Sequence, residues 1–205
     1  MLESKDWIGN KASVFKTLGA SNHTEAERQV NDFYATDPVA IDKLASVYRI
    51  PEVVWECACG EGHLSRRLIE YGHDVLSTDL VDRGYGHVRI DFLKENTLPE
   101  YLRGEDCCIL TNPPYKYATE FVEHALELLP EGKPAIMFLR TAALEGKGRF
   151  ERLYKNGWLH SIYQCIDRVL CAKNGDFVNY EGGAVAYAWY VFIKGNTETT
   201  KLFWI

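Results

Sequence analysis

Short apolar segments alternate with segments of helical spacing along most of this chain. Apolar residues recur every three or four positions in four segments, which predicts helices at residues 38–48, 63–71, 117–129 and 148–154. Continuous apolar runs predict buried strands at residues 53–57, 74–78, 88–90, 107–111 and 134–139. Two further strand-like segments, residues 161–169 and 184–193, close the chain.

This order of segments predicts the fold class. Strands that alternate with helices form a parallel sheet with helices on both faces. We therefore expect an α/β fold with a Rossmann-like, doubly wound and mostly parallel seven-stranded sheet. The two closing segments would add an antiparallel hairpin at one edge. Residues 1–31 are polar and weakly periodic, which predicts an N-terminal arm before a domain of residues 32–205.

The composition favours a globular protein without a membrane span. Hydrophobic residues make up 46% of the 205 positions, but no run of about 18 apolar residues occurs. The first residues also lack the apolar core of a signal peptide, so we expect a cytoplasmic protein. No Cys-x-x-Cys pair is present, which favours buried, reduced thiols and no metal site. The six cysteines are Cys57, Cys59, Cys107, Cys108, Cys165 and Cys171.

The formal net charge of −6 argues against strong non-specific binding of nucleic acid by the whole surface. A local basic face remains compatible with this balance, although scattered basic residues on solvated helices are equally common. The candidates for such a face are Lys11, Lys16, Arg140, Lys147, Arg149 and Arg152.

The sequence Asn112-Pro113-Pro114-Tyr115 directly follows the predicted strand at residues 107–111. Proline donates no hydrogen bond to a sheet and restricts the residue before it, so the strand should end in a rigid turn. Ligands bind at the carboxyl edge of open parallel sheets. The Asn112 side-chain oxygen and the Pro113 carbonyl would there form two acceptors suited to an –NH2 group. The Tyr115 ring could stack on a flat substrate.

A glycine-containing turn joins the first predicted strand to the following helix. Gly60 and Gly62 allow a tight turn and a close approach of the backbone to a ligand. The turn lacks the third glycine of a dinucleotide-binding fingerprint, because that position is Ser65. A phosphate-binding lysine is also missing, which excludes a P-loop. An ordinary strand-to-helix turn would explain the same residues.

Together these motifs resemble those of the class I amino-group methyltransferases, which use S-adenosylmethionine (SAM). Asn112-Pro113-Pro114-Tyr115 is similar to their motif IV, and Glu56 with the two glycines is similar to motif I. The resemblance implies that the glycine backbone contacts the methionyl part of SAM and that Glu56 acts through water or the amino group. It also implies that Asp79 binds the ribose hydroxyls, that Asp91 binds the adenine amino group, and that Phe92 packs on adenine.

The segment before the first helix resembles motif X of the same enzymes. Phe33, Tyr34 and Thr36 would flank the SAM methionine, although Asp37 is inserted between Thr36 and Pro38. Thr36 or Asp37 could equally cap the helix that starts there. The resemblance extends over about residues 32–140, in the order X, I, II, III and IV.

The resemblance implies transfer of the SAM methyl group to an exocyclic amine, with Asn112, Pro113, Pro114 and Tyr115 as the catalytic residues. We expect adenine N6 in DNA as the acceptor, because the motifs and the compact chain look like small phage- or prophage-type DNA methyltransferases. The alternatives are an RNA base, the glutamine amide of a release factor, and a catalytically silent subunit that binds SAM or nucleic acid.

Enzymes of this type that read a DNA sequence usually carry a target-recognition domain, and no separate one is expected in residues 32–205. Residues 141–158 and the polar loop at residues 173–183 are the best candidates for substrate contacts. A homodimer or a separate specificity subunit could supply more surface. The family resemblance also suggests that Tyr187 or Trp189 approaches the target base.

Overall fold

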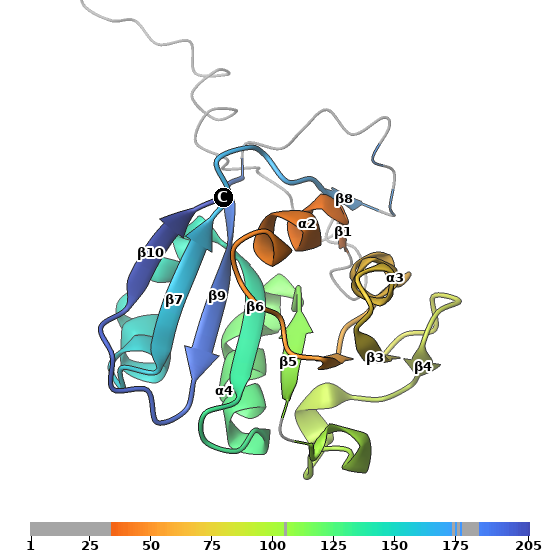
Figure 1. Cartoon of the computed structure of the whole chain (residues 1–205), viewed down its shortest axis with the longest axis horizontal. Coiled ribbons are helices and arrows are strands. Elements are labelled where there is room, and N and C mark those ends of the chain that lie inside the picture. The colour runs from red at the N-terminus through yellow and green to blue at the C-terminus, as the bar shows by residue number, and fades with distance from the viewer. Residues whose placement is uncertain (1–33, 105, 174, 176, 178–184) are drawn as a thin grey trace, which may run out of the picture.

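The structure, a computed structural model, describes residues 34–104, 106–173, 175, 177 and 185–205. Its main feature is one eight-stranded sheet with the order β10-β7-β9-β6-β5-β2-β3-β4, which Figure 1 shows from one edge to the other. Strands β1 and β8 form a separate two-stranded antiparallel sheet. The N-terminal arm predicted at residues 1–31 lies outside the described residues.

The strands and helices have the following bounds. The strands are β1 (Tyr34–Thr36), β2 (Val53–Glu56), β3 (Asp74–Asp79), β4 (His87–Val88), β5 (Cys107–Thr111), β6 (Pro134–Arg140), β7 (Leu159–Gln164), β8 (Cys171–Lys173), β9 (Tyr187–Ile193) and β10 (Lys201–Trp204). The helices are α2 (Val39–Ala45), α3 (His63–Glu70), α4 (Ala118–Leu128) and α5 (Lys147–Arg149), which continues into a π-helical turn at Phe150–Tyr154. Short 3₁₀ helices lie at Phe92–Lys94, Glu100–Leu102, Tyr115–Tyr117 and Thr141–Leu144.

The strand directions confirm the predicted fold class. Strands β4, β3, β2, β5 and β6 pair in parallel, whereas β9 is antiparallel to both of its neighbours, β6 and β7. The order β4-β3-β2-β5-β6 places the first long strand, β2, near the middle of the sheet. The loops that follow β2, β3, β5 and β6 therefore emerge at the same carboxyl edge.

Two details of the sheet differ from the prediction. The sheet has eight strands instead of seven, because β10 adds to β7 in parallel. The antiparallel strand β9 also lies inside the sheet, between β6 and β7, and not at an edge. The physical reason is burial: six of the seven residues of β9 are buried, whereas all four residues of β10 are exposed.

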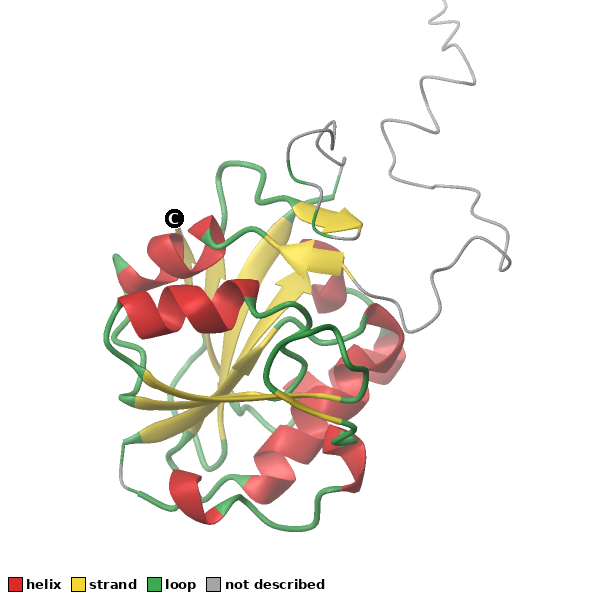
Figure 2. Ribbon diagram, turned by 90° about the vertical axis from the view of Figure 1, so that its right-hand side faces the viewer, coloured by secondary structure: helices red, strands yellow, loops and turns green. Residues whose placement is uncertain are grey.

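The alternation of side chains along the strands divides the core into two halves. On β5, Cys108 and Leu110 pack on the side of helices α2 and α3. Cys107 and Ile109 on the same strand pack on the side of α4. Successive strand residues point to opposite faces, so an uninterrupted apolar run supplies both halves. Figure 2 shows helices on both sides of the sheet.

All six cysteines are buried and free of disulfide bonds, in agreement with the sequence analysis. Within the described residues, no helix is long and apolar enough to cross a membrane.

Candidate active site

Asn112 stands at the carboxyl end of β5, and its amide group has one satisfied and one unsatisfied end. The Nδ2 group donates a hydrogen bond to Thr36 Oγ1 over 2.7 Å and lies 3.9 Å from Cys171 Sγ. The Oδ1 atom is buried and has no hydrogen-bond partner in the described part of the chain. Buried polar atoms almost always have a partner, so an orphaned acceptor at a loop edge marks a place for a donor that the described residues do not supply.

The two prolines fix the loop that carries this amide. Pro113 is buried, and Pro114 has φ −55° and ψ 127°, an extended conformation that turns the chain away from the sheet. The Tyr117 N–H then donates to the Pro114 carbonyl over 2.9 Å and starts a single 3₁₀ turn. The predicted rigid turn after β5 is therefore present.

Tyr115 belongs to an aromatic cluster beside Asn112. Its hydroxyl lies 2.6 Å from the Tyr187 hydroxyl, and its ring stacks on Tyr34 with the centroids 5.4 Å apart. The Arg140 guanidinium lies 3.9 Å from the centre of the same ring. Burial raises the pKa of both Tyr115 and Tyr187, so their phenols stay neutral at physiological pH.

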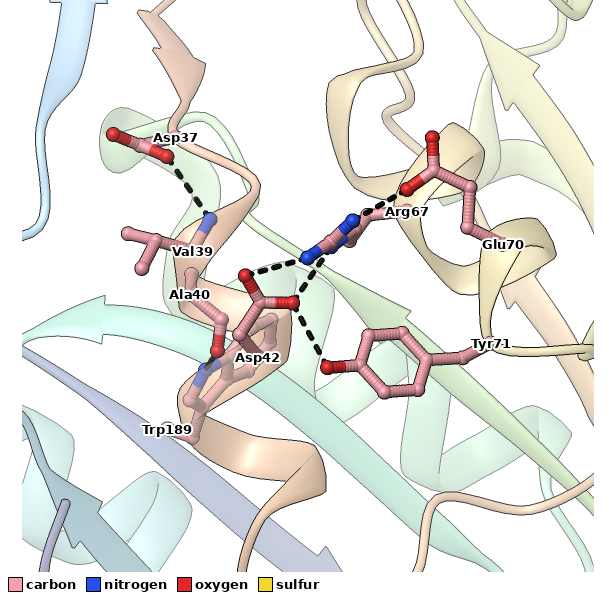
Figure 3. A network of polar contacts seen from close by, with 8 residues as sticks. All are labelled: Asp37, Val39, Ala40, Asp42, Arg67, Glu70, Tyr71 and Trp189. Atoms are coloured by element: carbon pink, nitrogen blue, oxygen red, sulfur yellow. Dashed lines mark hydrogen bonds and ion pairs between the residues drawn. The ribbon is translucent and has the colours of Figure 1, made fainter.

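Of the two residues of β9 expected to approach a substrate, the structure brings only Tyr187 to this cluster. Trp189 is completely buried, and its indole N–H donates to the Ala40 carbonyl of helix α2 over 2.8 Å (Figure 3). A tryptophan in this position anchors the helix to the sheet. A contact between Trp189 and a target base is therefore excluded by its burial.

Helix α2 is also fixed by charged groups, as Figure 3 shows. Asp42 accepts hydrogen bonds from the Arg67 guanidinium at 2.6 and 3.0 Å, and this pair ties α2 to α3. At the start of α2, Asp37 Oδ1 accepts a hydrogen bond from the Val39 N–H over 2.9 Å. Of the two residues that could have served the helix start, Asp37 takes this role, and the Thr36 hydroxyl is left for Asn112.

The turn after β2 forms the second half of the site. Gly60 and Gly62 have positive φ angles of 56° and 80°, which favour glycine. Asp79 at the end of β3 accepts hydrogen bonds from the Gly60 and Val81 N–H groups, both over 2.8 Å. The carboxylate thus stiffens the glycine turn.

A side chain at Gly62 would have no room. A Cβ atom there would overlap the ring of Tyr85, and the Arg66 guanidinium lies 4.5 Å from the centre of the same ring. Tyr85 gave no signal in the sequence, because no recognisable motif surrounds it. The structure adds it to the walls of the glycine turn.

Glu56 is placed differently from the other site candidates. It is only 2% exposed and accepts a hydrogen bond from Ser65, whose hydroxyl lies 2.6 Å from that of Ser77. Burial raises the pKa of the Glu56 carboxyl group to about 8, and the hydrogen bond from Ser65 opposes this shift. The carboxyl group therefore lies under the glycine turn, inside the protein.

Asp91 and Phe92 lie side by side in sequence but in different environments. The Asp91 carboxylate forms an ion pair with Lys94 over 2.8 Å at the protein surface. Phe92 is 2% exposed and packs against Trp55, Phe121 and His124. Its ring thus belongs to the core on the α4 side, and the structure gives no support to the predicted contact between Phe92 and adenine.

The remaining candidates divide into four groups, of which the first, Lys147, is exposed on α5. Arg152 pairs with Glu120 and Glu123, and Arg149 donates to backbone carbonyls of the preceding turn, so both guanidinium groups are engaged within the protein. Arg140 stays at the aromatic cluster. Lys11, Lys16, Phe33 and most of the loop at residues 173–183 lie outside the described residues. Among the residues that the structure describes, no three His, Cys, Asp or Glu side chains gather into a metal site.

Strand β8 contributes a residue that the sequence analysis missed. Cys171 is the cross-strand partner of Thr36 in the small β1–β8 sheet and contacts the side chains of Thr36, Tyr115 and Tyr187. Burial raises the pKa of its thiol. A three-residue strand carries too little periodicity to be recognised, so this contact could not be predicted from the sequence.

Comparisons with known proteins place this geometry in a fold. No protein-family model and no curated protein matches the sequence. Among solved structures, similarity extends to a modification subunit of a type I restriction enzyme from Vibrio vulnificus, with a TM-score of 0.57 and 16% identity. The match covers 88% of this chain but 48% of that one, so the chain spans about half of its length.

Two further solved structures are similar over most of the chain. One is a class I SAM-dependent methyltransferase from Listeria monocytogenes, with a TM-score of 0.53, 12% identity, and coverage of 94% of this chain and 71% of that one. The other is a dimethyladenosine transferase from Plasmodium falciparum, with a TM-score of 0.52, 18% identity, and coverage of 78% and 62%. The chain has the fold of the class I SAM-dependent methyltransferases.

Proposed function

We propose that this protein is a SAM-dependent methyltransferase that acts on the exocyclic amino group of a nucleic-acid base, with adenine N6 in DNA as the acceptor. The observation that carries the proposal is Asn112 Oδ1 at the carboxyl end of β5, a buried acceptor to which none of the described residues donates a hydrogen bond. An amide oxygen held there can accept a hydrogen bond from a substrate –NH2 group. The fold and the glycine turn after β2 are consistent with the same activity.

The residues of the glycine turn suit the proposed cofactor. Gly60 and Gly62 expose backbone in a conformation that leaves no space for a Cβ atom at Gly62. Asp79 stands at the end of the neighbouring strand with lone pairs for the ribose hydroxyls. Tyr34 and Phe33 would border the methionyl part. SAM, when bound, supplies an electrophilic methyl group and leaves as the thioether S-adenosylhomocysteine.

The acceptor residues would activate the amine by holding its hydrogens. The lone pair of an exocyclic amine is delocalised into the base and is therefore a poor nucleophile. Asn112 Oδ1 and the Pro113 carbonyl would each accept a hydrogen bond from one N–H group of the amine and favour a tetrahedral nitrogen with a localised lone pair. One of these protons leaves to solvent when the nitrogen gains its new bond to carbon. Most of the rate gain would come from this positioning.

No protein base is needed for the proton in this scheme. Burial raises the pKa of Tyr115, Tyr187 and Cys171, so all three groups stay protonated near pH 7. They can orient the base and accept or donate hydrogen bonds as neutral groups. The reaction then depends on localising the lone pair on the amine nitrogen and not on a strong base.

The aromatic cluster and Arg140 favour a nucleic acid over a protein amide. Tyr34 and Tyr115, which are partly exposed, offer flat surfaces suited to a planar base. Arg140 is exposed at the end of β6, and its guanidinium above Tyr115 is suited to a neighbouring phosphate. A base in a duplex would have to be flipped out to reach Asn112. The similar restriction modification subunit and dimethyladenosine transferase are consistent with this choice.

The proposal also covers the domain organisation, the location and the partners of the protein. Residues 32–205 would act as one methyltransferase domain in the cytoplasm. A homodimer or a separate specificity subunit would supply the surface that reads a DNA sequence, because the described residues after β6 mainly complete the sheet.

The proposal is tested by transfer of labelled methyl groups from SAM to DNA, RNA and protein fractions. We expect label in DNA as N6-methyladenine. Label in RNA or in a glutamine of a release factor would replace the proposed acceptor, and SAM binding without any transfer would indicate a silent subunit. The expected results of the Asn112→Ala variant are a rate at least about 100-fold lower and an unchanged affinity for SAM. Full activity of this variant on a verified acceptor would contradict the role of Asn112.

A further inference from the structure

Thr36, which the motif resemblance assigns to the cofactor half of the site, contacts the acceptor half. It is 4% exposed, ends strand β1, and lies 76 positions before Asn112 in the sequence. Its Oγ1 atom accepts the hydrogen bond from Asn112 Nδ2 over 2.7 Å. Cys171 is the cross-strand partner of Thr36, and its Sγ atom lies 3.9 Å from the same Asn112 Nδ2.

The direction of this hydrogen bond matters because an asparagine amide can lie in two ways. A rotation of 180° exchanges the oxygen, which accepts, with the –NH2 group, which donates. Only one orientation presents an acceptor to a substrate amine. The other would place two –NH2 groups against each other. A fixed partner for Nδ2 therefore decides whether the Asn112 Oδ1 faces the substrate.

The surroundings of Thr36 favour its role as an acceptor. Its hydroxyl also contacts the Cys171 sulfur, a weak acceptor to which the hydroxyl can donate a hydrogen bond. The oxygen lone pairs are then left for the Asn112 amide. Asp37, not Thr36, serves the start of α2, and Trp189 and Arg67 hold that helix in place (Figure 3). The Thr36 side chain therefore contacts the loop that carries Asn112, and helix α2, which follows Thr36, is held in place by Trp189 and Arg67.

We propose that Thr36 is a positioning residue that sets the orientation of the Asn112 amide and thereby presents Oδ1 to the amine. This inference rests on the proposed function for its effect on the rate. It differs from the role implied by the motif, in which Thr36 flanks the methionyl part of SAM. The two roles predict different results for a variant that keeps the shape of threonine and removes its hydroxyl.

The test compares Thr36→Val with Thr36→Ser. We expect Thr36→Val to lower kcat about 10- to 100-fold, because the amide loses the partner that fixes its orientation. The Kd for SAM, measured by calorimetry, should stay within about twofold of the original protein, and Thr36→Ser should recover most of the rate. A large increase in the Kd for SAM with little change in kcat would overturn the inference and support the contact with SAM.

A matched control separates positioning from stability. Thr78 is equally buried and accepts one hydrogen bond, from Trp55 Nε1 over 2.9 Å. Thr78→Val should destabilise the protein in urea about as much as Thr36→Val and leave kcat unchanged. If both variants lowered kcat in proportion to their loss of stability, Thr36 would have a structural role only, and the inference would be wrong.

A second readout does not depend on methyl transfer. In ¹⁵N NMR spectra, the Asn112 side-chain –NH2 should exchange slowly with water in the original protein and faster in Thr36→Val. Unchanged exchange in that variant would refute the orienting contact even if the enzyme were active. Slow exchange that Thr36→Val accelerates, in a protein that methylates nothing, would support the contact and refute the proposed function.

Discussion

Glu56 illustrates how a single buried side chain can couple the proposed cofactor half of the site to pH. The carboxyl group lies beneath the glycine turn, hydrogen-bonded to Ser65 and removed from water. Burial raises its pKa from 4.5 to about 8, since a buried carboxylate lacks the solvation that it has in the unfolded chain. The native protein therefore holds a proton on Glu56 at pH values where the unfolded chain has lost it.

The sign of the resulting pH dependence follows from proton binding. Between pH 4.5 and 8 the folded state binds more protons than the unfolded state, so the stability contributed by Glu56 is present at low pH and is lost as the pH rises through this range. From pH 6 to pH 8 the loss amounts to about 2 kcal/mol in the free energy of unfolding. Glu56→Gln should remove this loss of stability between pH 6 and pH 8.

Urea unfolding of both proteins at pH 6 and pH 8 measures this difference. Glutamine keeps an acceptor for Ser65 and does not titrate, so Glu56→Gln should lose less stability than the original protein over the same interval. Equal losses in the two proteins would show that Glu56 is not the group responsible.

At the scale of elements, the turns at the carboxyl edge of the sheet have stricter requirements than the strands that precede them. Gly62 follows β2 at this edge, whereas Gly72 lies between α3 and β3 at the opposite edge, and both have strongly positive φ angles, 80° and 90°. They differ in what a side chain would meet. At Gly72 nothing lies within 4 Å of an added Cβ atom, whereas at Gly62 the Tyr85 ring occupies that position.

This pair of glycines allows a controlled prediction. Gly72→Ala should destabilise the protein by about 1 kcal/mol, the cost of a left-handed conformation for alanine. Gly62→Ala should cost about 3 kcal/mol, because Tyr85 must also move, and it should weaken SAM binding. Urea unfolding and calorimetry on both variants give the comparison. Equal destabilisation with unchanged SAM affinity would contradict the close packing of Tyr85 against the turn.

The elements that the sequence predicted and those that it missed differ in length and burial. Strands such as β5 and β6 are continuous apolar runs, and they were predicted to within a residue or two. Strands β1 and β8 have three residues each, and β10 is exposed along its whole length, so none of them has a recognisable pattern. Local periodicity needs both length and burial: β1 and β8 are largely buried but too short to show it, and β10 is exposed.

The candidate site shows the same division. Motifs close in sequence located Asn112, Gly60 and Gly62, since each depends on its immediate neighbours. The contact of Thr36 with Asn112 joins residues 76 positions apart, and no local pattern encodes it. The burial of Phe92 likewise depends on helix α4, far along the chain. Pairing across the fold decides the role of such residues, and a single sequence does not reveal it.

At the scale of the whole molecule, the net charge of −6 restricts how the protein could hold a polyanion. Arg67, Arg152 and Arg49 form ion pairs with carboxylates of the same chain. A guanidinium in such a pair gives little net attraction to a phosphate. Arg140 instead lies on the Tyr115 ring, at the carboxyl edge where the acceptor would enter. Binding of DNA should therefore be local, with few phosphate contacts and a shallow dependence on salt.

The salt dependence of DNA binding tests this difference between the arginines. If Arg140 contacts one phosphate, Arg140→Gln should reduce the slope of log K against log salt by about 1. Arg152→Gln is the matched control, because its guanidinium already pairs with Glu120 and Glu123 and should leave the slope unchanged. Both slopes can be measured by fluorescence anisotropy with a labelled duplex between 50 and about 200 mM salt, the range over which counterion release is usually resolved. An unchanged slope in Arg140→Gln would place the phosphate contacts elsewhere on the protein. An equal decrease in both variants would mean that the charge of the whole surface, and not the guanidinium at the acceptor site, attracts the DNA.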